Sequence, residues 1–252
     1  MAVALAEHGR EWFFVRYADP LPQLRLRVRD EGGGAEVSWL LAELAARVDD
    51  GVLARFEVVG YERELERYGG PAGLDCCERL FCAESLAVVR LIELAGLLPA
   101  DSDVDSADLA LLCADTMLAG LGLDRAAVVE LTGRVRRGYA EEFAADPTVS
   151  SRALNRELNA RRGRLRALLG GTHPVLTDVL RDWASGFRDR ICPIGARLGS
   201  LDGELTQPVE QILPSLLHLH ANRLGLDRHE EYRMTHRLHE VSKDLCHAKV
   251  AP

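Results

Sequence analysis

The sequence predicts an α+β fold, with a small antiparallel sheet at the N-terminus followed by a predominantly helical region. Two patterns lead to this prediction. The segment LRLRVR, residues 24–29, alternates apolar and basic side chains, and a period of two residues is the signature of a half-buried strand. From about Leu74 onward, apolar residues recur at helical spacing in one segment after another.

The N-terminal region is expected to contain a hairpin-like unit, a helix and a short further strand. Residues 12–17, WFFVRY, are aromatic and β-branched, and the prolines at 20 and 22 mark a turn because proline cannot continue a strand ladder. Ser38 is the expected N-cap of a helix over residues 38–48. A short strand is expected over residues 53–61.

The remaining chain is expected to be helical, and we predict one domain over residues 1–252, in which residues 1–73 are sheet-rich and residues 74–252 are helical. A stretch rich in glycine and proline, residues 192–203, is expected to be a loop. The predicted helices cover residues 75–98, 106–121, 124–139, 154–169, 175–189, 208–223 and 227–246.

Charge and composition exclude several classes of function. The formal net charge is -8, which argues against nucleic acid as a direct partner. The sequence contains no apolar run of about 18 residues and no signal-peptide pattern, so we expect no membrane span and a cytoplasmic location. Walker A, GxGxxG and GxSxG motifs are also missing, which argues against nucleotide-dependent and classical hydrolase activities.

The six cysteines form no CxxC pair, so we expect reduced thiols, no metal and no cofactor. A zinc site from His236 and His239 is the alternative, because these residues are three apart on a predicted helix.

Arg25 and Arg27 are the first candidate site residues, since they share one face of the predicted strand 24–29. Two neighbouring guanidinium groups repel each other, so such a face meets either solvent or an anion. A guanidinium presents a planar fork of donors that matches a carboxylate or a phosphate. Spacing alone leaves both alternatives open.

A second candidate lies in YERELERYGG, residues 61–70, where a run of alternating charge ends at a glycine pair. One interpretation is a solvated helix that ends at a glycine C-cap. The other is a tight loop, permitted by Gly69 and Gly70, that holds Arg67 beside Tyr68 for a ligand.

The third candidate is the predicted helix 208–223, on which His218, Asn222 and Arg223 lie about one turn apart. Histidine titrates near neutrality, so His218 is a candidate general acid or base. The alternative is a histidine that only packs between helices. The arginine-rich segment 134–166 could receive an acidic peptide, but we expect a solvated face paired with glutamates.

Four segments together resemble one family: residues 12–28, 61–70, 78–92 and 215–231. Their sequences and order are similar to the C-terminal elimination domain of class I lanthipeptide dehydratases, which also occurs as a free-standing thiopeptide-type bacteriocin biosynthesis protein. The chain departs from that pattern at Gln23, where the family usually has His, at Arg63, where it usually has Pro, and at Glu84, where it usually has Asp.

The resemblance implies a reaction, a site and partners. A glutamyl-tRNA-dependent partner protein esterifies Ser or Thr of a precursor peptide with glutamate, and the elimination domain removes the glutamate to leave dehydroalanine or dehydrobutyrine. The family's catalytic positions correspond to Arg25, Arg27, Arg67 and His218, and we expect Tyr68, Asn222 and Arg223 to bind substrate. Guanidinium groups would stabilise the enolate-like charge and the departing carboxylate.

Two alternatives remain open at this stage. Some free-standing relatives are pyridine synthases, which join two dehydroalanines by a formal [4+2] aza-cycloaddition and expel the leader peptide. The other alternative is a non-catalytic module that binds the leader peptide. The expected partners are a precursor peptide with its leader and the glutamylating protein, with a homodimer left open.

Overall fold

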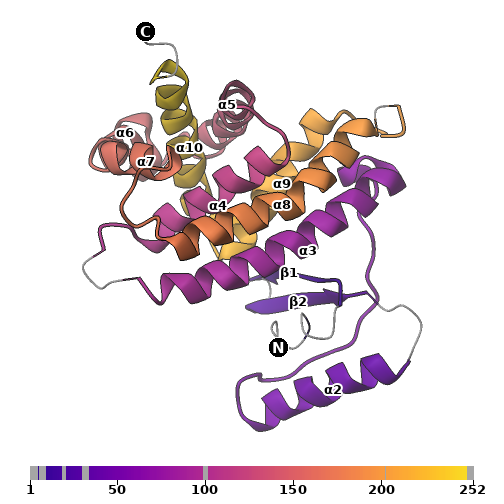
Figure 1. The fold of residues 1–252 in the computed structure, drawn as a ribbon. Coiled ribbons are helices and arrows are strands. Elements are labelled where there is room, and N and C mark those ends of the chain that lie inside the picture. Colours follow the sequence, from indigo (N-terminus) through magenta and orange to yellow (C-terminus); the bar gives the residue numbers. More distant parts are fainter. Residues whose placement is uncertain are drawn as a thin grey trace.

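The computed structural model describes residue 5 and residues 10–18, 21–29, 34–98, 102–201 and 203–248. It has the predicted α+β fold, with a two-stranded antiparallel sheet near the N-terminus and helices after it (Figure 1). The elements are β1 (Trp12–Tyr17), β2 (Gln23–Val28), α2 (Gly34–Asp49), the 3-10 helix η1 (Glu66–Tyr68), α3 (Gly70–Ala95), α4 (Ser106–Gly120), α5 (Arg125–Glu142), η2 (Pro147–Val149), α6 (Ser151–Asn159), α7 (Arg162–Leu169), α8 (Asp178–Ser200), α9 (Val209–Leu224) and α10 (Arg228–Ala248).

The register of the sheet confirms the alternation predicted for LRLRVR. Trp12 lies opposite Val28 and Tyr17 opposite Gln23, and residues directly opposite each other share a face. One face therefore carries Leu24, Leu26 and Val28 together with Trp12, Phe14 and Arg16. The other carries Arg25 and Arg27 together with Phe13, Val15 and Tyr17.

Side chains from two helices take the place of a third strand along the outer edge of β1. The Phe14 amide donates to Ser85 Oγ of α3 at 3.1 Å, and Arg223 Nε of α9 donates to the Phe14 carbonyl at 3.1 Å. The side-chain amide of Asn222 accepts from the Arg16 amide and donates to the Arg16 carbonyl, each at 2.8 Å. These bonds fix β1 against α3 and α9.

A buried ionic cluster lies directly behind this edge. Glu84 of α3 accepts from Arg223 Nη1 and bonds His220 Nδ1, each at 2.7 Å, and all three side chains are fully buried. His220 Nε2 also lies 3.3 Å from the carbonyl oxygen of Ala110 in α4. The cluster therefore connects β1, α3, α4 and α9.

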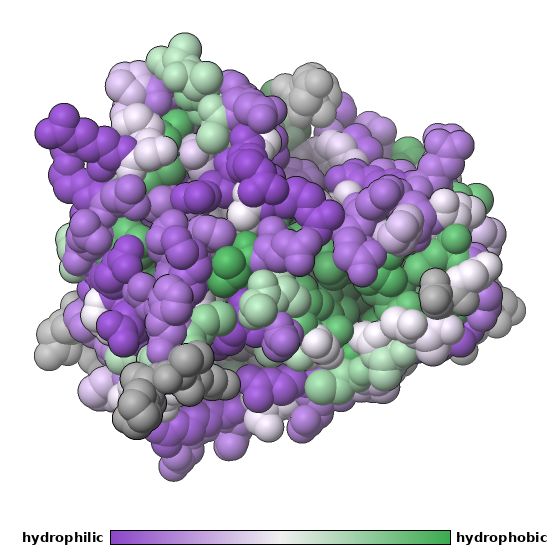
Figure 2. Space-filling model, turned by 90° about the horizontal axis from the view of Figure 1, so that it is seen from above, coloured by the Kyte–Doolittle hydropathy of each residue, from purple (hydrophilic) through white to green (hydrophobic). Residues whose placement is uncertain are grey.

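The apolar core extends between the long helices. Helix α3 packs against α8 and β1, α4 packs against α8, and α5 packs against α10. In Figure 1, α2 lies on the opposite side of the sheet from these helices. Figure 2 views the molecule from above, and apolar side chains gather in a hollow on the half of that face that holds α8 and α9. Among the described helices, none alone is long and apolar enough to cross a membrane; α4 and α5 meet that test only as a pair bent by 120°.

The predicted strand over residues 53–61 is wrong, because residues 55–64 form no helix or strand. A strand requires a partner, and the described sheet contains only β1 and β2. Val58 and Val59 of this segment are 73% and 65% exposed. Their side chains therefore lack the packing against neighbouring residues through which valine favours a strand.

Three further predictions need correction. Helix α2 begins at Gly34, so Ser38 lies inside the helix and is not its N-cap. The segment 154–169 is divided into α6 and α7. The expected loop at 192–203 is instead largely the second half of α8, which runs through Pro193 to Ser200. A Cβ on Gly195 would lie 2.7 Å from the Leu121 Cα, and one on Gly120 would lie 2.9 Å from the Ile191 Cβ. These glycines thus allow α8 and α4 to approach closely, and they do not form a loop.

The structure answers why YERELERYGG ends in two glycines. Residues 61–64 are irregular, so the solvated helix is wrong, but the glycine C-cap is present, because Gly69 caps the single turn of η1 and α3 begins at Gly70. Gly69 and Gly70 have φ values of +79° and +85°, which L-residues with side chains rarely adopt. One turn later, a Cβ on Gly73 would lie 2.0 Å from the Tyr68 carbonyl oxygen. Glycines therefore fold η1 tightly onto the start of α3.

Four of the nine arginines in segment 134–166 pair with acidic residues of other elements. Arg136 pairs with Glu240, Arg162 with Asp244, and Arg161 and Arg164 both pair with the buried Asp108. These ion pairs connect α5 and α7 to α10 and α4. The ion pairs therefore leave fewer arginines of this segment available to bind an acidic peptide.

Replacing Gly73 with Ala is expected to destabilise the protein by about 2 kcal/mol, because the added methyl group collides with the Tyr68 carbonyl. Gly186 of α8 is the matched control, since a Cβ there meets nothing within 4 Å. Gly186→Ala is expected to stabilise by about 1 kcal/mol through helix propensity. Urea unfolding of both variants measures the difference, and equal effects would contradict the tight packing of η1 on α3.

Stability is expected to fall as pH is lowered from about 6.5 to about 4. Burial, with Arg136 adding to it, lowers the pKa of His236 to about 4, below the ordinary value of about 6.5. Between these values the unfolded chain binds a proton that the folded chain does not bind. His236→Gln should flatten the dependence in denaturant titrations between pH 7 and 4, whereas the exposed His247→Gln should not. An unchanged slope in His236→Gln would refute this assignment.

Candidate active site

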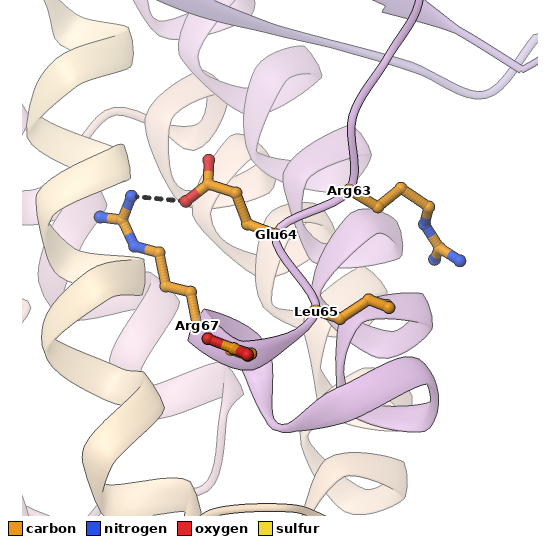
Figure 3. Close-up of a pocket in the computed structure, with 5 residues that line it drawn as sticks. Arg63, Glu64, Leu65 and Arg67 are labelled. Atoms are coloured by element: carbon orange, nitrogen blue, oxygen red, sulfur yellow. Dashed lines mark hydrogen bonds and ion pairs between the residues drawn. The ribbon is translucent and has the colours of Figure 1, made fainter.

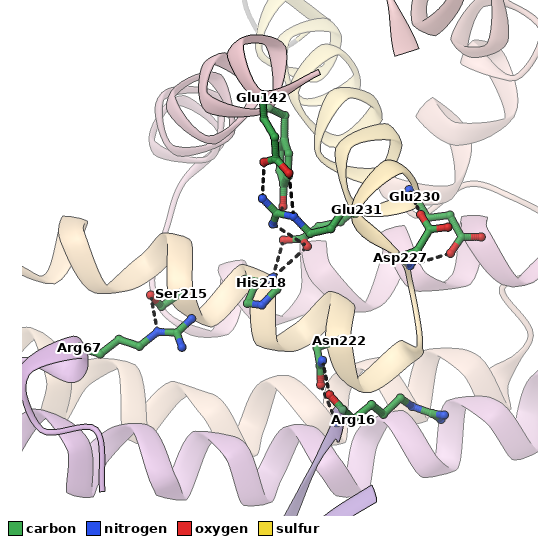
Figure 4. A network of polar contacts seen from close by, with 11 residues as sticks. Arg16, Arg67, Glu142, Ser215, His218, Asn222, Asp227, Glu230 and Glu231 are labelled. Carbon is green, nitrogen blue, oxygen red and sulfur yellow. Dashed lines mark hydrogen bonds and ion pairs between the residues drawn. The ribbon is translucent and has the colours of Figure 1, made fainter. Parts of the chain in front are cut away.

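One face of α9 collects the polar residues of the candidate site. Helix α9 buries Ile212, Leu216 and Leu217 in the core and ends at Gly225, whose φ is +79°. Ser215, His218 and Asn222 follow one another at spacings of three and four residues, so they line one face (Figure 4). His218 lies between Ser215 and Asn222 in this row.

Arg67 reaches this row from η1. Its Nε donates to Ser215 Oγ at 3.2 Å, and its Nη1 lies 3.0 Å from Glu64 Oε2. Gln207, in the loop before α9, holds η1 in place by donating to the Arg67 carbonyl at 2.8 Å. Ser215 and His218 are separated by a rise of about 4.5 Å along the helix, so Arg67 contacts α9 about one turn from His218.

The Arg67 guanidinium borders an open surface hollow of about 720 Å³, lined by residues 63–67. Figure 3 shows that Arg67 and Glu64 point to one side of this segment, whereas Arg63 points to the other. The Arg67 and Glu64 side chains are 38% and 55% exposed. Because an exposed ion pair of this kind is weak, a ligand carboxylate can replace Glu64 at low cost.

His218 is held by a buried carboxylate of α10. Its Nδ1 lies 2.9 Å from Glu231 Oε2, and the two side chains are 37% and 3% exposed. An ionised carboxylate at this position would only accept hydrogen bonds, and it would favour the tautomer of a neutral His218 with the proton on Nδ1 and a lone pair on Nε2. Among the described residues, Nε2 has no hydrogen-bond partner. His218 can therefore accept a proton at Nε2.

Glu231 is itself part of a network behind His218. Arg228 Nη1 lies 3.4 Å from Glu231 and donates to the Tyr139 hydroxyl at 2.9 Å. Burial, and then the hydrogen bond to Glu231, raise the pKa of Tyr139. Tyr139 therefore remains a neutral donor, and Glu231 is fixed on the side away from the solvent.

Arg25 and Arg27 form a second cationic group on the sheet. The Arg25 guanidinium lies 3.6 Å from the centre of the Tyr17 ring, and the Arg27 guanidinium lies 5.0 Å from that of Tyr61. No contact joins either arginine to Arg67 or to His218 in the region of the chain that the structure describes. The structure thus brings Arg67 and His218 together and leaves Arg25 and Arg27 as a separate pair.

An aromatic cluster lies between the two cationic groups. Phe13 contacts Tyr61 and Phe81, and Phe81 contacts Tyr68, with ring centres 5.3 to 5.9 Å apart. The Arg67 guanidinium lies 5.6 Å from the Tyr68 ring at the other end. Packing of these rings fixes the relative positions of η1 and the sheet.

The three residues expected to bind substrate have internal partners instead. Tyr68 is 3% exposed, and burial raises the pKa of its hydroxyl. The amide of Asn222 accepts one hydrogen bond from the backbone of Arg16 and donates one to it, and Arg223 is fully buried on Glu84. We therefore assign these residues to positioning β1, η1 and α9, and do not propose them as substrate contacts.

Sequence reasoning missed Glu231, Ser215 and Arg16. Arg16 Nε donates to the Arg223 carbonyl at 3.0 Å, which places a cation at the C-terminal end of α9. In the sequence, Glu231 belongs to the charged run DRHEE and looks like a solvated residue. Only the contact between α9 and α10 reveals that it faces His218.

The described residues include no group of three or more potential metal ligands. The candidate zinc pair is buried, with His236 beside Arg136 and His239 Nδ1 3.0 Å from the Val129 carbonyl. Burial raises the pKa of the Cys77 and Cys113 thiols, which opposes a role as nucleophiles.

Comparison with known proteins confirms the resemblance found in the sequence. The family model described as lantibiotic biosynthesis dehydratase C-term matches residues 2–242. Subtilin biosynthesis protein SpaB of Bacillus subtilis is 39% identical over 87 residues, which are 32% of this chain and 8% of SpaB. Nisin biosynthesis protein NisB of Lactococcus lactis subsp. lactis is 33% identical over 90 residues, 36% of this chain and 9% of NisB. The matched segments thus span less than a tenth of these relatives.

Three solved structures share the fold at identities below 25%. The tRNA dependent lantibiotic dehydratase MibB from Microbispora sp. 107891 superposes with a TM-score of 0.68 at 22% identity, over 99% of this chain and 26% of MibB. TsrL has a TM-score of 0.62 at 17% identity, over 96% of this chain and 87% of TsrL. The pyridine synthase TbtD from thiomuracin biosynthesis has a TM-score of 0.60 at 16% identity, over 99% of this chain and 92% of TbtD.

The family match therefore extends across both the sheet that carries Arg25 and Arg27 and the helix that carries His218. This chain belongs to the family of lantibiotic biosynthesis dehydratase C-terminal domains.

Proposed function

We propose that this chain eliminates glutamate from glutamylated Ser or Thr of a precursor peptide, leaving dehydroalanine or dehydrobutyrine. The observation that carries the proposal is that Arg67, from η1, bonds Ser215 on the face of α9 that also carries His218, about one helical turn further along. A cation for a carboxylate and a free imidazole nitrogen are what this elimination needs.

Arg67 is proposed to hold the glutamyl carboxylate. Its described acidic partner is the exposed Glu64, and its guanidinium can form a bidentate pair with a substrate carboxylate in exchange. The same charge would stabilise glutamate as it departs. Stabilisation of charge that develops in the transition state lowers the barrier more than equal binding of the ground state.

His218 is proposed to take the α-proton of the esterified residue at Nε2. The electron pair of the broken C–H bond forms the Cα–Cβ double bond, the Cβ–O bond breaks, and glutamate leaves as an anion. Glu231 would orient the imidazole and stabilise the imidazolium that results. His218 then returns the proton to solvent or to the product carboxylate.

Arg25 and Arg27 are proposed to hold further anionic groups of the peptide on the sheet side of the site. Neither guanidinium forms an ion pair with a carboxylate of the described residues, and each is instead stacked on a tyrosine. Stacking keeps the guanidinium groups in place while their donors remain available.

Glutamylation would come from a separate activity. MibB is described as a tRNA dependent dehydratase, and this chain superposes on only 26% of it. A glutamyl-tRNA-dependent protein acting on the same precursor peptide would supply the ester. Since glutamyl-tRNA is made in the cytoplasm, we propose that the chain acts there.

Pyridine synthesis is the second candidate, because the chain covers 92% of the pyridine synthase TbtD. Mass spectrometry separates the two reactions when the chain is incubated with a glutamylated and with an already dehydrated peptide. Loss of glutamic acid from the first indicates elimination. Release of the leader peptide from the second indicates cycloaddition, and no turnover of either indicates a binding module.

Arg67→Ala is expected to reduce kcat/KM for elimination by roughly 10²–10³, so that glutamylated peptide accumulates. Arg90→Ala is the charge-matched control, since Arg90 lies on α3 and pairs with Glu93. Liquid chromatography with mass spectrometry follows the ester, and circular dichroism checks that both variants fold. Elimination by Arg67→Ala at the rate of the control would refute the role of Arg67.

His218→Ala is expected to lower kcat by roughly 10²–10⁴, and Glu231→Gln to lower kcat less while leaving KM unchanged. The ¹⁵N NMR signals of the His218 ring should report a proton on Nδ1 in the original chain. In Glu231→Gln they should indicate a mixture of tautomers. If Glu231→Gln keeps the ¹⁵N signals of the original chain and its full activity, Glu231 is not a positioning residue.

A further inference from the structure

The two edges of the β1–β2 sheet differ. Along the outer edge of β1, the backbone groups of Phe14 and Arg16 are bonded by side chains of Ser85, Asn222 and Arg223. Since alternate residues of a strand point their backbone groups to opposite edges, Phe13, Val15 and Tyr17 bond β2. Their partners are Arg27, Arg25 and Gln23.

The backbone groups of Leu24, Leu26 and Val28 therefore point away from β1. Among the described residues, no backbone hydrogen bond reaches them, and the described sheet ends at β2. The Leu26 carbonyl has one long contact, at 3.5 Å, with the Arg27 side chain. An edge with unpaired N–H and C=O groups is a template for another strand.

The side chains of β2 specify what kind of strand fits. Arg25 and Arg27 project from one face without an acidic partner among the described residues, in a chain whose net charge is -8. Leu24 projects from the other face and is 57% exposed, and Leu21 just before β2 is 66% exposed. A complementary strand would alternate acidic and apolar residues.

We propose that the edge of β2 binds an extended segment of the peptide substrate as a third, antiparallel strand, with acidic residues at alternate positions facing Arg25 and Arg27. This inference rests on the proposed function for the identity of the peptide. Because Leu24, Leu26 and Val28 form the hydrogen bonds, Arg25 and Arg27 occupy the non-hydrogen-bonded positions. Opposing side chains lie closest there, with Cα atoms about 4.5 Å apart.

Such pairing also explains the division of the two cationic groups. A peptide held along β2 is positioned by backbone bonds that do not depend on its sequence, while its acidic side chains set the register. Arg67 and His218 remain free for the esterified residue. Binding and chemistry would then involve different arginines.

Hydrogen–deuterium exchange with mass spectrometry tests this proposal on the intact chain. The probe is a synthetic peptide of about six residues that alternates Glu and Val. Slower exchange in residues 23–29, together with fluorescence-detected binding, is the expected result. A peptide of the same sequence with N-methylated backbone amides cannot donate, and it should bind at least about tenfold more weakly. Equal affinity for the two peptides, or protection elsewhere in the chain, would overturn the proposal.

Variants separate the charge from the backbone contribution. Arg25→Ala and Arg27→Ala should each weaken binding of the alternating peptide about fivefold, whereas the exposed Arg181→Ala of α8 should not. Leu24→Pro removes an outward N–H without removing a bond to β1, and should weaken binding with circular dichroism unchanged. If Leu24→Pro fails to fold, the N-methylated peptide tests the same backbone hydrogen bonds on the original chain.

Three further outcomes are decisive. Protection of residues 23–29 that depends on protein concentration without peptide would show that a second copy occupies the edge, and would refute peptide binding. Peptide binding with no glutamate elimination would leave this inference standing and reject the proposed reaction. Elimination without protection of β2 would reject this inference and leave the proposed reaction standing.

Discussion

The buried carboxylate of Glu84 is the interaction on which the candidate site depends. An ionised side chain with no exposure is tolerated only when its hydrogen bonds are satisfied, and Glu84 has both His220 and Arg223 within 2.7 Å. Arg223 in turn donates to the Phe14 carbonyl, so the same cluster fixes the edge of β1. Removing Glu84 would leave a buried guanidinium without its counter-charge and disconnect the sheet from α9.

The rest of the site follows from the position that this cluster gives α9. With His220 and Arg223 turned inward, Ser215, His218 and Asn222 face the opposite side. Asn222 then binds the backbone of β1, and Ser215 meets Arg67. The tight turn at Gly69 and Gly70 brings η1 to the same place, and Glu231 completes the environment of His218 from α10. Elements β1, η1 and α10 thus meet at one short row of residues on α9.

Sequence analysis predicted what local pattern and resemblance can predict. The alternation of LRLRVR gave the correct faces of β2, and helical periodicity located most of α3, α4, α5, α9 and α10. The predictions failed where tertiary contacts oppose the secondary structure that the local sequence favours. Residues 53–61 have strand propensity but no partner strand, and Pro193 and Gly195 lie inside a helix because α4 approaches there.

The site residues divide in the same way. The motif singled out Arg67 and His218 as candidates, but it predicted Arg67 beside Arg25 and Arg27, whereas Arg67 lies against Ser215 of α9. The inward orientation of Arg223 and the contact of Glu231 with His218 depend on helix packing that one sequence does not encode locally.

The central claim is that Arg67 and His218 act on one substrate group. A crystal structure of the chain with a peptide carrying a glutamyl amide in place of the reactive ester tests it most directly, because the amide cannot be eliminated. The account predicts a glutamyl carboxylate within hydrogen-bond distance of the Arg67 guanidinium, with the α-carbon of the modified residue facing His218 Nε2. A glutamyl group bound away from Arg67, or a modified residue on the far side of α9 from His218, would contradict it.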